Sequence, residues 1–472
     1  MKSKNYNVLY VETGSGYIGK IIEWQEITVQ ASTRVQCREE LSNLLYEKIL
    51  SYQQQGKELP EGYGDNFLIE KISFTDEIDK NFDIESEFFD MAEESSQQES
   101  SVNQFALNFY ATLEKNQNVF FSPYSIAFLL MVLSFGAKGA TQEQIIQVLQ
   151  SDTNEDISAE IMQLMRALES INKRNVIQIY TANALYVQTP VLLDKFKQLM
   201  HEYDITINLV DFINNKVVVV QQINDWCAEK TRGKITKLLE PDLITDLTRL
   251  VISNAIYFKA EWDVCFEHSM SAIFHLSAQD KIKVPMMKRM ETSVRHLGTT
   301  NLQLLRLDYR ALDESPSMSM IILLPKQIDG LAALEQKLTP FLLRKWILAL
   351  NANRPKTMDI YMPTFTINAK IDLHSALKQL GMNNAFDKQA DFSEIDGTKQ
   401  LHIKHFLHQS FITVNEIGVE AGAVSMVDID LECCSEETCT VNHPFLFLIM
   451  ENSSGVILFM GRVVNPLLES AM

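Results

Sequence analysis

Apolar positions at the start of the chain follow the spacing of short strands with one helix among them. Four stretches have strand-like patterns: Asn7–Val11, Tyr17–Trp24, Glu26–Ala31 and Phe67–Phe74. A glycine-rich turn typical of a hairpin separates the first two, and apolar residues recur at helical spacing from Leu41 to Tyr52. The pattern predicts a small α+β domain over residues 1–74 with the element order β-β-β-α-β.

Two segments of this domain carry a family resemblance. GYIGKIIEW at residues 16–24 precedes VQCREELSNLLYEKILSYQQQGKELPE at residues 35–61, and this arrangement resembles the small HicB-type antitoxin domain. The resemblance implies a module for dimerisation or another protein contact. Such antitoxins often add a DNA-binding segment, but no basic stretch follows here, so we expect no nucleic-acid partner.

An acidic stretch follows the small domain. Residues 75–100 hold ten Asp or Glu residues against a single lysine, Lys80. Such a segment cannot bury enough apolar surface to offset the entropy lost on ordering. We therefore interpret residues 75–101 as a linker. An acidic docking peptide is the alternative, since Phe82, Phe88 and Phe89 could bind a partner.

The remainder of the chain begins with helical periodicity over Gln104–Lys115. A second helix is expected at Pro123, which lacks the backbone N–H that the first turn of a helix leaves unpaired. Ser122 is placed to cap this helix, and the apolar run Ile126–Phe135 continues it.

A series of motifs then extends to the C-terminus. They are NVFFSPYSI at 118–126, TANALY at 181–186, ISNAIYFKAEW at 252–262, VPMM at 284–287, HPFLF at 443–447 and FMGR at 459–462. In this order they resemble the serpin family. The resemblance implies one large serpin domain over residues 102–472, with a central, mostly antiparallel sheet. The whole chain is thus expected to be a multi-domain protein of mixed α/β class.

The serpin resemblance also assigns structural roles inside the central sheet. In the family, a buried hydrogen-bonded cluster called the shutter gates this sheet, and a site called the breach lies where the sheet first opens. The resemblance assigns the shutter to Ser122, Ser125, Asn254 and His408, and the breach to Trp262.

We find no motif for catalysis in the chain. There is no phosphate-binding loop, no G-x-S-x-G turn and no H-E-x-x-H helix. His402, His405 and His408 stand three apart, but their segment is rich in strand-forming residues. On a strand, His405 would face away from the other two. We therefore predict no enzyme activity, no cofactor and no metal site.

One segment near the C-terminus has a strict two-residue period over residues 419–430. Its odd positions are small or apolar: Val419, Ala421, Ala423, Ser425, Val427 and Ile429. Its charges all fall at even positions: Glu420, Asp428 and Asp430. If the segment became a central strand, one face would be uncharged and the charges would point away from it. No proline interrupts it, so every backbone N–H could join a ladder.

In serpins this segment is the reactive-centre loop, which a target protease cleaves as bait. The resemblance implies that the cleaved loop enters the central sheet as a new strand and carries the acylated protease with it. The hinge of this movement is assigned to Glu416, Gly418, Val419, Glu420, Ala421, Gly422, Ala423 and Val424. Small hinge residues favour insertion, whereas Ile417 and Gly422 depart from the commonest family residues.

The bait bond is expected sixteen residues beyond Glu416, between Glu432 and Cys433. Asp430–Leu431 and Cys433–Cys434 are the alternatives. Acidic bait residues suit a serine protease whose specificity pocket holds a cation, or a caspase-type cysteine protease. A non-inhibitory serpin that binds partners through its N-terminal module is the second hypothesis for function.

Composition narrows the possible partners and compartments. The formal net charge is −19 without a basic cluster, which argues against nucleic acid and anionic membranes as partners. No apolar run reaches the roughly 20 residues that span a bilayer, and the chain start lacks a signal-peptide core. Six cysteines in 472 residues favour free thiols. We therefore expect a cytoplasmic protein.

Overall fold

The computed structural model divides the chain into two compact units, Met1–Ile84 and Glu85–Met472. We describe each unit by itself. The structure describes residues 4–13, 16–21, 28–31, 70–74, 100–172, 177–189, 191–311, 317–419 and 437–468.

The first unit contains a four-stranded antiparallel sheet in the order β3-β2-β1-β4. Its strands are β1 (Lys4–Thr13), β2 (Gly16–Ile21), β3 (Thr28–Ala31) and β4 (Glu70–Phe74). Each strand overlaps one of the four predicted strands, and β1 and β2 pair as a hairpin from Thr13 and Gly16 outward. The predicted helix and residues 75–99 of the predicted linker lie outside the described residues, whereas Ser100 and Ser101 at the end of that linker form the start of α3.

A six-stranded sheet in the order β14-β15-β16-β8-β6-β7 forms the centre of the second unit. Its strands are β6 (Ile177–Val187), β7 (Thr206–Leu209), β8 (Leu250–Glu261), β14 (Phe365–Asp372), β15 (Ile403–Val414) and β16 (Gly418–Val419). Most neighbours are antiparallel, but β8 and β15 also pair in parallel. The mixed α/β class and the mostly antiparallel central sheet are as predicted.

A nine-stranded sheet packs at one end of the central sheet. Its order is β17-β13-β10-β11-β12-β18-β19-β5, and β9 pairs with β10. The strands are β5 (Val119–Phe121), β9 (Glu267–His275), β10 (Lys281–Gly298), β11 (Leu302–Asp308), β12 (Met318–Pro325), β13 (Lys356–Pro363), β17 (Thr438–Thr440), β18 (Phe445–Glu451) and β19 (Val456–Val463).

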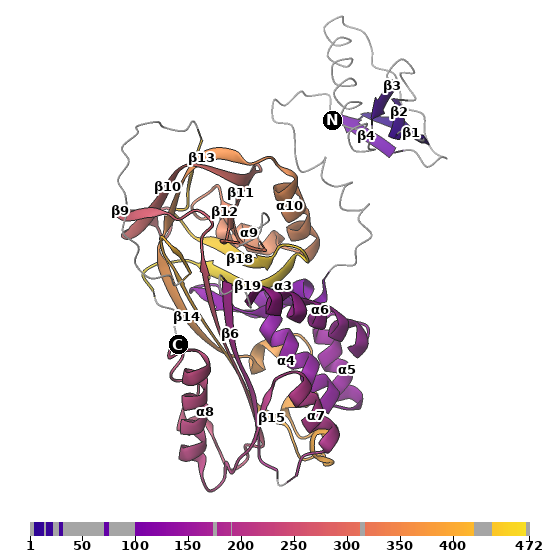
Figure 1. Ribbon diagram of the computed structural model, residues 1–472, viewed down its shortest axis with the longest axis vertical. Helices are drawn as coiled ribbons and strands as arrows, with labels where there is room; N and C mark the ends of the chain where they lie inside the picture. Colours follow the sequence, from indigo (N-terminus) through magenta and orange to yellow (C-terminus); the bar gives the residue numbers. More distant parts are fainter. Residues whose placement is uncertain are drawn as a thin grey trace, which may run out of the picture. The chain divides into compact units, whose positions relative to one another are not determined.

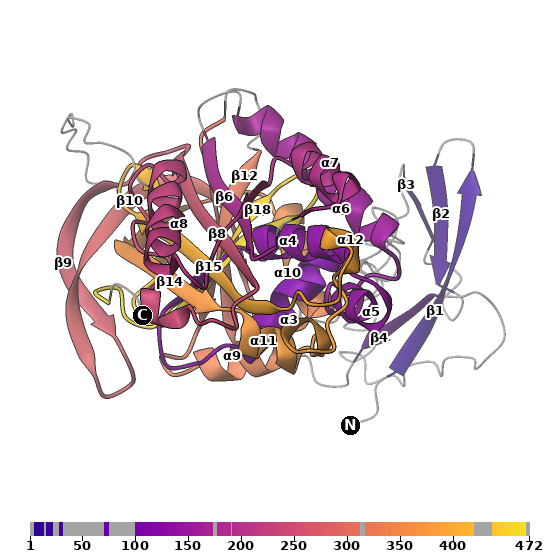
Figure 2. The ribbon, with the colours of Figure 1, turned by 90° about the horizontal axis from the view of Figure 1, so that it is seen from below.

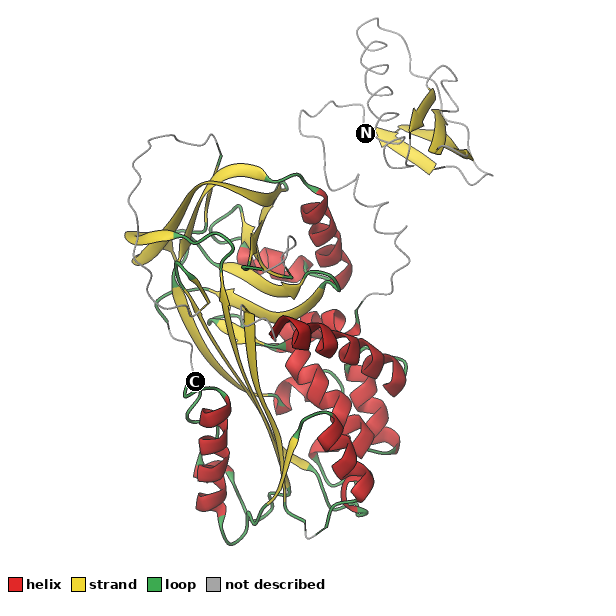
Figure 3. Cartoon of the chain, viewed as in Figure 1, coloured by secondary structure: helices red, strands yellow, loops and turns green. Residues whose placement is uncertain are grey.

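Helices cover both faces of the central sheet, with α8 on one side and α4 to α7 on the other (Figure 1). They are α3 (Ser101–Thr112), α4 (Pro123–Gly136), α5 (Gly139–Val148), α6 (Asn154–Asn172), α7 (Asp194–Glu202), α8 (Lys216–Lys230), η1 (Pro241–Leu243), α9 (Leu331–Lys337), α10 (Pro340–Ala352), α11 (His374–Gln379), η2 (Asn384–Phe386) and α12 (Ser393–Asp396). Figure 3 shows that α9 and α10 accompany the nine-stranded sheet, and α3 contacts both of them.

Helix α4 forms the middle of the core beneath the central sheet. It begins at Pro123, and the Ser122 side chain accepts a hydrogen bond from the Ser125 backbone N–H at 3.2 Å, as the sequence predicts. Nearly all of its side chains are buried, which explains why the sequence is apolar on every face of this helix. The helix therefore holds Ser122 and Ser125 against the underside of the sheet.

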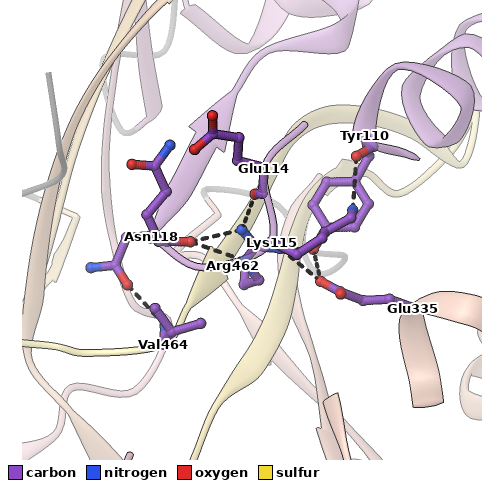
Figure 4. A network of polar contacts seen from close by, with 8 residues as sticks. Tyr110, Glu114, Lys115, Asn118, Glu335, Arg462 and Val464 are labelled. Atoms are coloured by element: carbon purple, nitrogen blue, oxygen red, sulfur yellow. Dashed lines mark hydrogen bonds and ion pairs between the residues drawn. The ribbon is translucent and has the colours of Figure 1, made fainter. Parts of the chain in front are cut away.

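A buried charged cluster fixes the C-terminal strand β19 to two helices (Figure 4). The Arg462 side chain is fully buried, and its Nη1 lies 3.0 Å from Oε1 of Glu335 on α9. Arg462 also donates to the Glu114 carbonyl, and the hydroxyl of Tyr110 on α3 donates to Glu335. Lys115 Nζ lies 3.6 Å from the centroid of the Tyr110 ring. We call Tyr110, Lys115, Glu335 and Arg462 the Arg462 cluster.

Candidate functional site

The boundary between β8 and β15 runs along the middle of the central sheet, and we call it the parting line. Over most of its length the two strands pair directly, from Leu250 with Ile403 to Tyr257 with Phe411. At its upper end, β16 lies between them, where Val419 pairs with both β8 and β15. The sheet is therefore closed along most of the parting line and held open by one short strand at the end.

A tight turn connects β15 to β16. The Asn415 side-chain Oδ1 accepts hydrogen bonds from the backbone N–H groups of Ile417 and Gly418, both at 3.1 Å. The Asn415 backbone N–H donates to the Gly418 carbonyl at 2.9 Å. A Cβ atom at position 418 would lie 2.2 Å from the carbonyl oxygen of Ala260, so only glycine allows β16 to approach β8 this closely.

Trp262, which the sequence analysis assigns to the breach, lies at this end of the sheet on the β8 side. Its backbone N–H donates to the Ile417 carbonyl and its ring Nε1 to the Asn415 carbonyl, both at 2.9 Å. The ring stacks on Tyr309 with centroids 4.9 Å apart and planes 7° from parallel. The carbonyl of Glu416 accepts from Phe266 N–H at 2.7 Å. Trp262 thus contacts the turn twice, through its backbone at Ile417 and through its ring at Asn415.

The structure describes only the first part of the predicted hinge. Val419 is fully buried in the main hydrophobic core, and Gly418 pairs with Glu261. The remaining hinge residues, from Glu420 to Val424, lie outside the described residues. So does the predicted bait bond between Glu432 and Cys433.

The four residues assigned to the shutter are buried together below β16. Asn254 on β8 donates from Nδ2 to the Ser125 Oγ at 2.6 Å, and its Oδ1 accepts from Nδ1 of His408 on β15. The Ser122 backbone N–H donates to His408 Nε2 at 3.2 Å, and the Ser122 hydroxyl donates to the Leu458 carbonyl at 2.7 Å. We call Ser122, Ser125, Asn254 and His408 the shutter cluster.

The donors around His408 fix its protonation state. Nε2 accepts from the Ser122 N–H, so the single proton of the neutral ring resides on Nδ1 and is donated to Asn254. Burial lowers the pKa of His408 to about 3. The shutter cluster is therefore neutral, and it joins β8 and β15 across the parting line through hydrogen bonds alone.

Comparisons with known proteins agree with this geometry. Residues 100–466 match the family model described as serpin (serine protease inhibitor). The leukocyte elastase inhibitor of Xenopus tropicalis is 33% identical over 383 residues, which cover 78% of this chain and 99% of that protein. Serpin B9 of Homo sapiens is 33% identical over 359 residues, which cover 74% and 94%. The chain belongs to the serpin family.

Solved structures share the same fold. The crystal structure of uncleaved ovalbumin aligns with a TM-score of 0.71 at 27% identity, covering 78% of this chain and 99% of that one. Serpin48 from the insect Tenebrio molitor, described as a highly specific serpin, aligns with a TM-score of 0.67 at 32% identity, covering 77% and 97%. The serpin match begins at residue 100, so the HicB resemblance gains no support and stays a prediction.

Two further points follow, one from the family and one from the structure of this serpin. Serpins are inhibitors of proteases and not enzymes, which confirms the prediction that the chain is no enzyme. Among the described residues, no helix is long and apolar enough to cross a membrane.

Two contacts were missing from the sequence analysis, one made by the shutter cluster and one by another residue of β15. Asn254 Nδ2 also donates to Oδ1 of Asn183 on β6 at 2.5 Å, and the Ser410 hydroxyl donates to the Phe120 carbonyl at 2.7 Å. Asn183 lies directly opposite Asn254 in the β6–β8 ladder. A register argument on the motifs TANALY and ISNAIYF would have found this pair, whereas Ser410 had no signal beyond its place on β15.

The histidines of β15 face opposite sides of the central sheet, as the strand spacing predicts. His408 points toward α4, where it meets the shutter cluster. The ring of His405 contacts Asp372 on β14 and the carbonyl of Leu243 in η1. Each histidine thus has hydrogen-bond partners of its own.

Proposed function

We propose that this serpin inhibits its target protease as a suicide substrate, by inserting its cleaved reactive-centre loop along the parting line. The observation that supports this most strongly is β16. Its two residues already lie between β8 and β15 with antiparallel pairing to both strands. An inserted loop would continue this strand, so insertion is an extension of an existing ladder.

The register of β16 predicts where the rest of the loop would lie. Val419 pairs with Ala260 on β8 and with Val414 on β15, and both ladders are antiparallel. Six residues further on, Ser425 would therefore lie between Asn254 and His408. Asn254 and His408 are already direct partners across the parting line. The register of β16 with β8 therefore agrees with its register with β15. The loop would bring a new hydroxyl into the shutter cluster.

The two faces of the loop suit the two sides of the sheet. Val419 is buried on the side of the main core, and alternation would bring Ala421 and Ala423 to the same side. The charged residues at even positions would face the side of α8. About ten new ladder hydrogen bonds at roughly 1 kcal/mol each give a driving force on the order of 10 kcal/mol. The intact protein would then be kinetically trapped.

The chemistry of trapping belongs to the protease. Its serine oxygen would attack the Glu432 carbonyl carbon, form an ester and release the amine of Cys433 as the leaving group. Insertion would then carry the ester away before water reaches it. The acidic residues before the bond favour a protease with a cation in its specificity pocket. The Xenopus relative is named for leukocyte elastase, and the bait proposed here suits an enzyme of different preference.

An experiment on the bait tests this proposal. The serpin is incubated with a serine protease that cleaves after Glu, and we expect an SDS-resistant complex together with a cut after Glu432 by mass spectrometry. The variant Ala421→Glu should be cut at the same bond without trapping, because it carries a charge to the buried side. Cleavage of the wild type without a complex would overturn the proposal and favour a non-inhibitory binding protein.

For the N-terminal domain we propose a protein-interaction module. Its small antiparallel sheet is compatible with the predicted HicB-type arrangement, although the serpin match does not reach it. Light scattering of the full chain and of a chain starting at residue 100 would test for dimerisation. We also propose a reducing compartment such as the cytoplasm, since each described cysteine, Cys227, Cys265 and Cys439, is a free thiol.

A further inference from the structure

The His405 side chain connects two parts of the molecule that sequence alone does not bring together. Its Nδ1 lies 3.1 Å from the carboxylate of Asp372, and its Nε2 lies 2.9 Å from the backbone carbonyl of Leu243. Both partners are acceptors, so each ring nitrogen must carry a hydrogen to make its bond. A neutral imidazole carries only one, and the complete pair of bonds therefore requires the protonated ring. We call these three groups the His405 bridge.

The two partners of His405 belong to opposite sides of the parting line. Asp372 ends β14, which is paired with β15 along its length. Leu243 ends η1, in the linker between α8 and β8, and this linker runs directly into β8 at Leu250. The His405 bridge therefore crosses from the β14–β15 side to the β8 side.

The linker is held against the sheet by apolar contacts. It contributes buried side chains to a hydrophobic cluster with Val251 and Ala255 of β8 and Leu407 of β15: Ile235, Leu238, Leu239 and Ile244. Figure 2 shows α8, which precedes the linker, lying over the strands β8, β14 and β15. The linker thus covers the lower part of the parting line, beyond the shutter cluster.

Insertion of a strand must disrupt this arrangement. A new strand between β8 and β15 increases their separation by about 4.8 Å, the spacing of neighbouring strands. The bond to Asp372 can persist because β14 stays paired with β15. The bond to Leu243 is broken unless the linker leaves β8, which its short connection to Leu250 opposes.

We propose that the His405 bridge is a pH-sensitive brace that slows the opening of the central sheet, with His405 acting as a positioning residue for loop insertion. This proposal rests on the proposed insertion mechanism and adds a means of regulating its rate. The brace is strongest when His405 is protonated, because both bonds are then made. It weakens as the pH rises and one of the two acceptors loses its donor.

Charged groups from several elements surround the bridge. Burial raises the pKa of Asp372, but hydrogen bonds from His405 and from the His374 backbone outweigh it and hold this pKa below its usual range. Asp372 is therefore ionised over the physiological range. The other charged groups around the bridge are His374 and Lys378 on α11 and Lys404 on β15, and Asp242 precedes Leu243 in η1. Burial lowers the pKa of His374, so that ring adds little positive charge near neutral pH.

A synthetic peptide of residues 419–430 tests the brace without a protease. Such a peptide should enter the intact full-length serpin as the missing strand, and native electrophoresis follows the rate. Wild-type protein should take up the peptide about tenfold faster near pH 8 than near pH 5.5, because the two bonds of the bridge need a hydrogen on each ring nitrogen and the second hydrogen is lost as the pH rises. His405→Gln should be fast at both pH values, since glutamine does not titrate.

Two further variants make the test specific. His402→Gln removes a neighbouring histidine outside the bridge and should keep the wild-type rate and pH profile. Asp372→Asn removes the carboxylate acceptor of the bridge and should raise the uptake rate toward that of His405→Gln. It replaces His405→Gln if that variant does not fold.

The outcomes separate the brace from the insertion mechanism. Equal uptake rates and pH profiles for wild type and His405→Gln would overturn the brace and leave insertion intact. No uptake by any variant at either pH would contradict strand insertion itself. A His405→Gln rate that rises but retains the full pH profile would also overturn the brace, because the titrating group would then lie elsewhere.

Discussion

The shutter cluster and the Arg462 cluster are both polar and, apart from the exposed Lys115, buried, yet they differ in charge and in what surrounds them. The shutter cluster is neutral, with His408 kept unprotonated by burial, and it joins β8 and β15 where the sheet is proposed to open. The Arg462 cluster contains an ion pair whose two side chains are 0% and 9% exposed. It joins α3, α9 and β19, none of which borders the parting line.

The difference suggests that neutral hydrogen bonds suit the place where the sheet opens, whereas a buried ion pair suits a part of the fold that does not move. Neutral hydrogen bonds can be exchanged for others of the same kind, so a cluster such as Asn254 with His408 can open and accept the Ser425 hydroxyl. A buried ion pair cannot exchange partners without leaving a charge unpaired, which is strongly unfavourable. We therefore expect the Arg462 cluster to be equally important before and after insertion, and the shutter cluster to change its partners.

The largest expected effect comes from breaking the ion pair. Arg462→Met leaves Glu335 buried without its partner and should lower the free energy of unfolding by about 3–5 kcal/mol, in the intact and the cleaved form alike. Chemical denaturation measures the free energy of unfolding of both forms. The matched control is Arg310→Met, whose ion pair with Glu261 is exposed, with an expected loss under about 1 kcal/mol. Equal losses for the two variants would contradict the role of the Arg462 cluster.

Acid should weaken the shutter cluster next. In the unfolded chain His408 takes up a proton near its ordinary pKa of about 6.5, whereas in the folded chain its pKa is about 3. As the pH falls, the unfolded state thus binds the proton first. The contribution of neutral His408 to the stability of the folded state is therefore complete above pH 6.5 and is lost as the pH falls toward 3. Each pH unit in this window removes about 1.4 kcal/mol. Unfolding of wild type and His408→Asn should therefore diverge in slope between these limits, and parallel slopes would count against a neutral buried ring.

The smallest effect tests the exchange of partners. Ser425→Ala should leave the stability of the intact protein unchanged, because the residue joins the shutter cluster only after insertion. In the cleaved protein it should lower the free energy of unfolding by about 1 kcal/mol, the usual size of one hydrogen bond. Val427→Ala removes apolar area on the same face and serves as the comparison. No greater loss for Ser425→Ala in the cleaved form than in the intact form would mean that the register of insertion is wrong.

Much of this site was readable from the sequence because its signals are local. Proline after a capping serine predicts where α4 begins, and the strand spacing of β15 separates His405 from His408. The shutter residues come from motifs that the resemblance assigns one by one. Their hydrogen bonds, however, depend on strand register, and Asn183 became visible only when β6 was paired with β8.

Other parts of the site had no signal in the sequence. Nothing in the residues around Asn415 indicates that β16 already lies between β8 and β15, since the same turn chemistry fits an exposed loop. Glu335 lies 127 residues from Arg462, and a charged residue on a short helix is most often exposed. The contact between His405 and the Leu243 carbonyl also depends on tertiary packing. Side-chain type gives no information about a backbone partner so distant in the chain.

The heat stability of the serpin after its loop has been cut tests the central claim most directly. The loop is nicked after Glu432 by a protease that is then removed, and calorimetry compares the main unfolding transition with that of the intact protein. If insertion along the parting line stabilises the cleaved protein by on the order of 10 kcal/mol, its Tm should rise by on the order of 20 °C. An unchanged Tm after complete cleavage would show that the loop stays outside the sheet and would contradict the account.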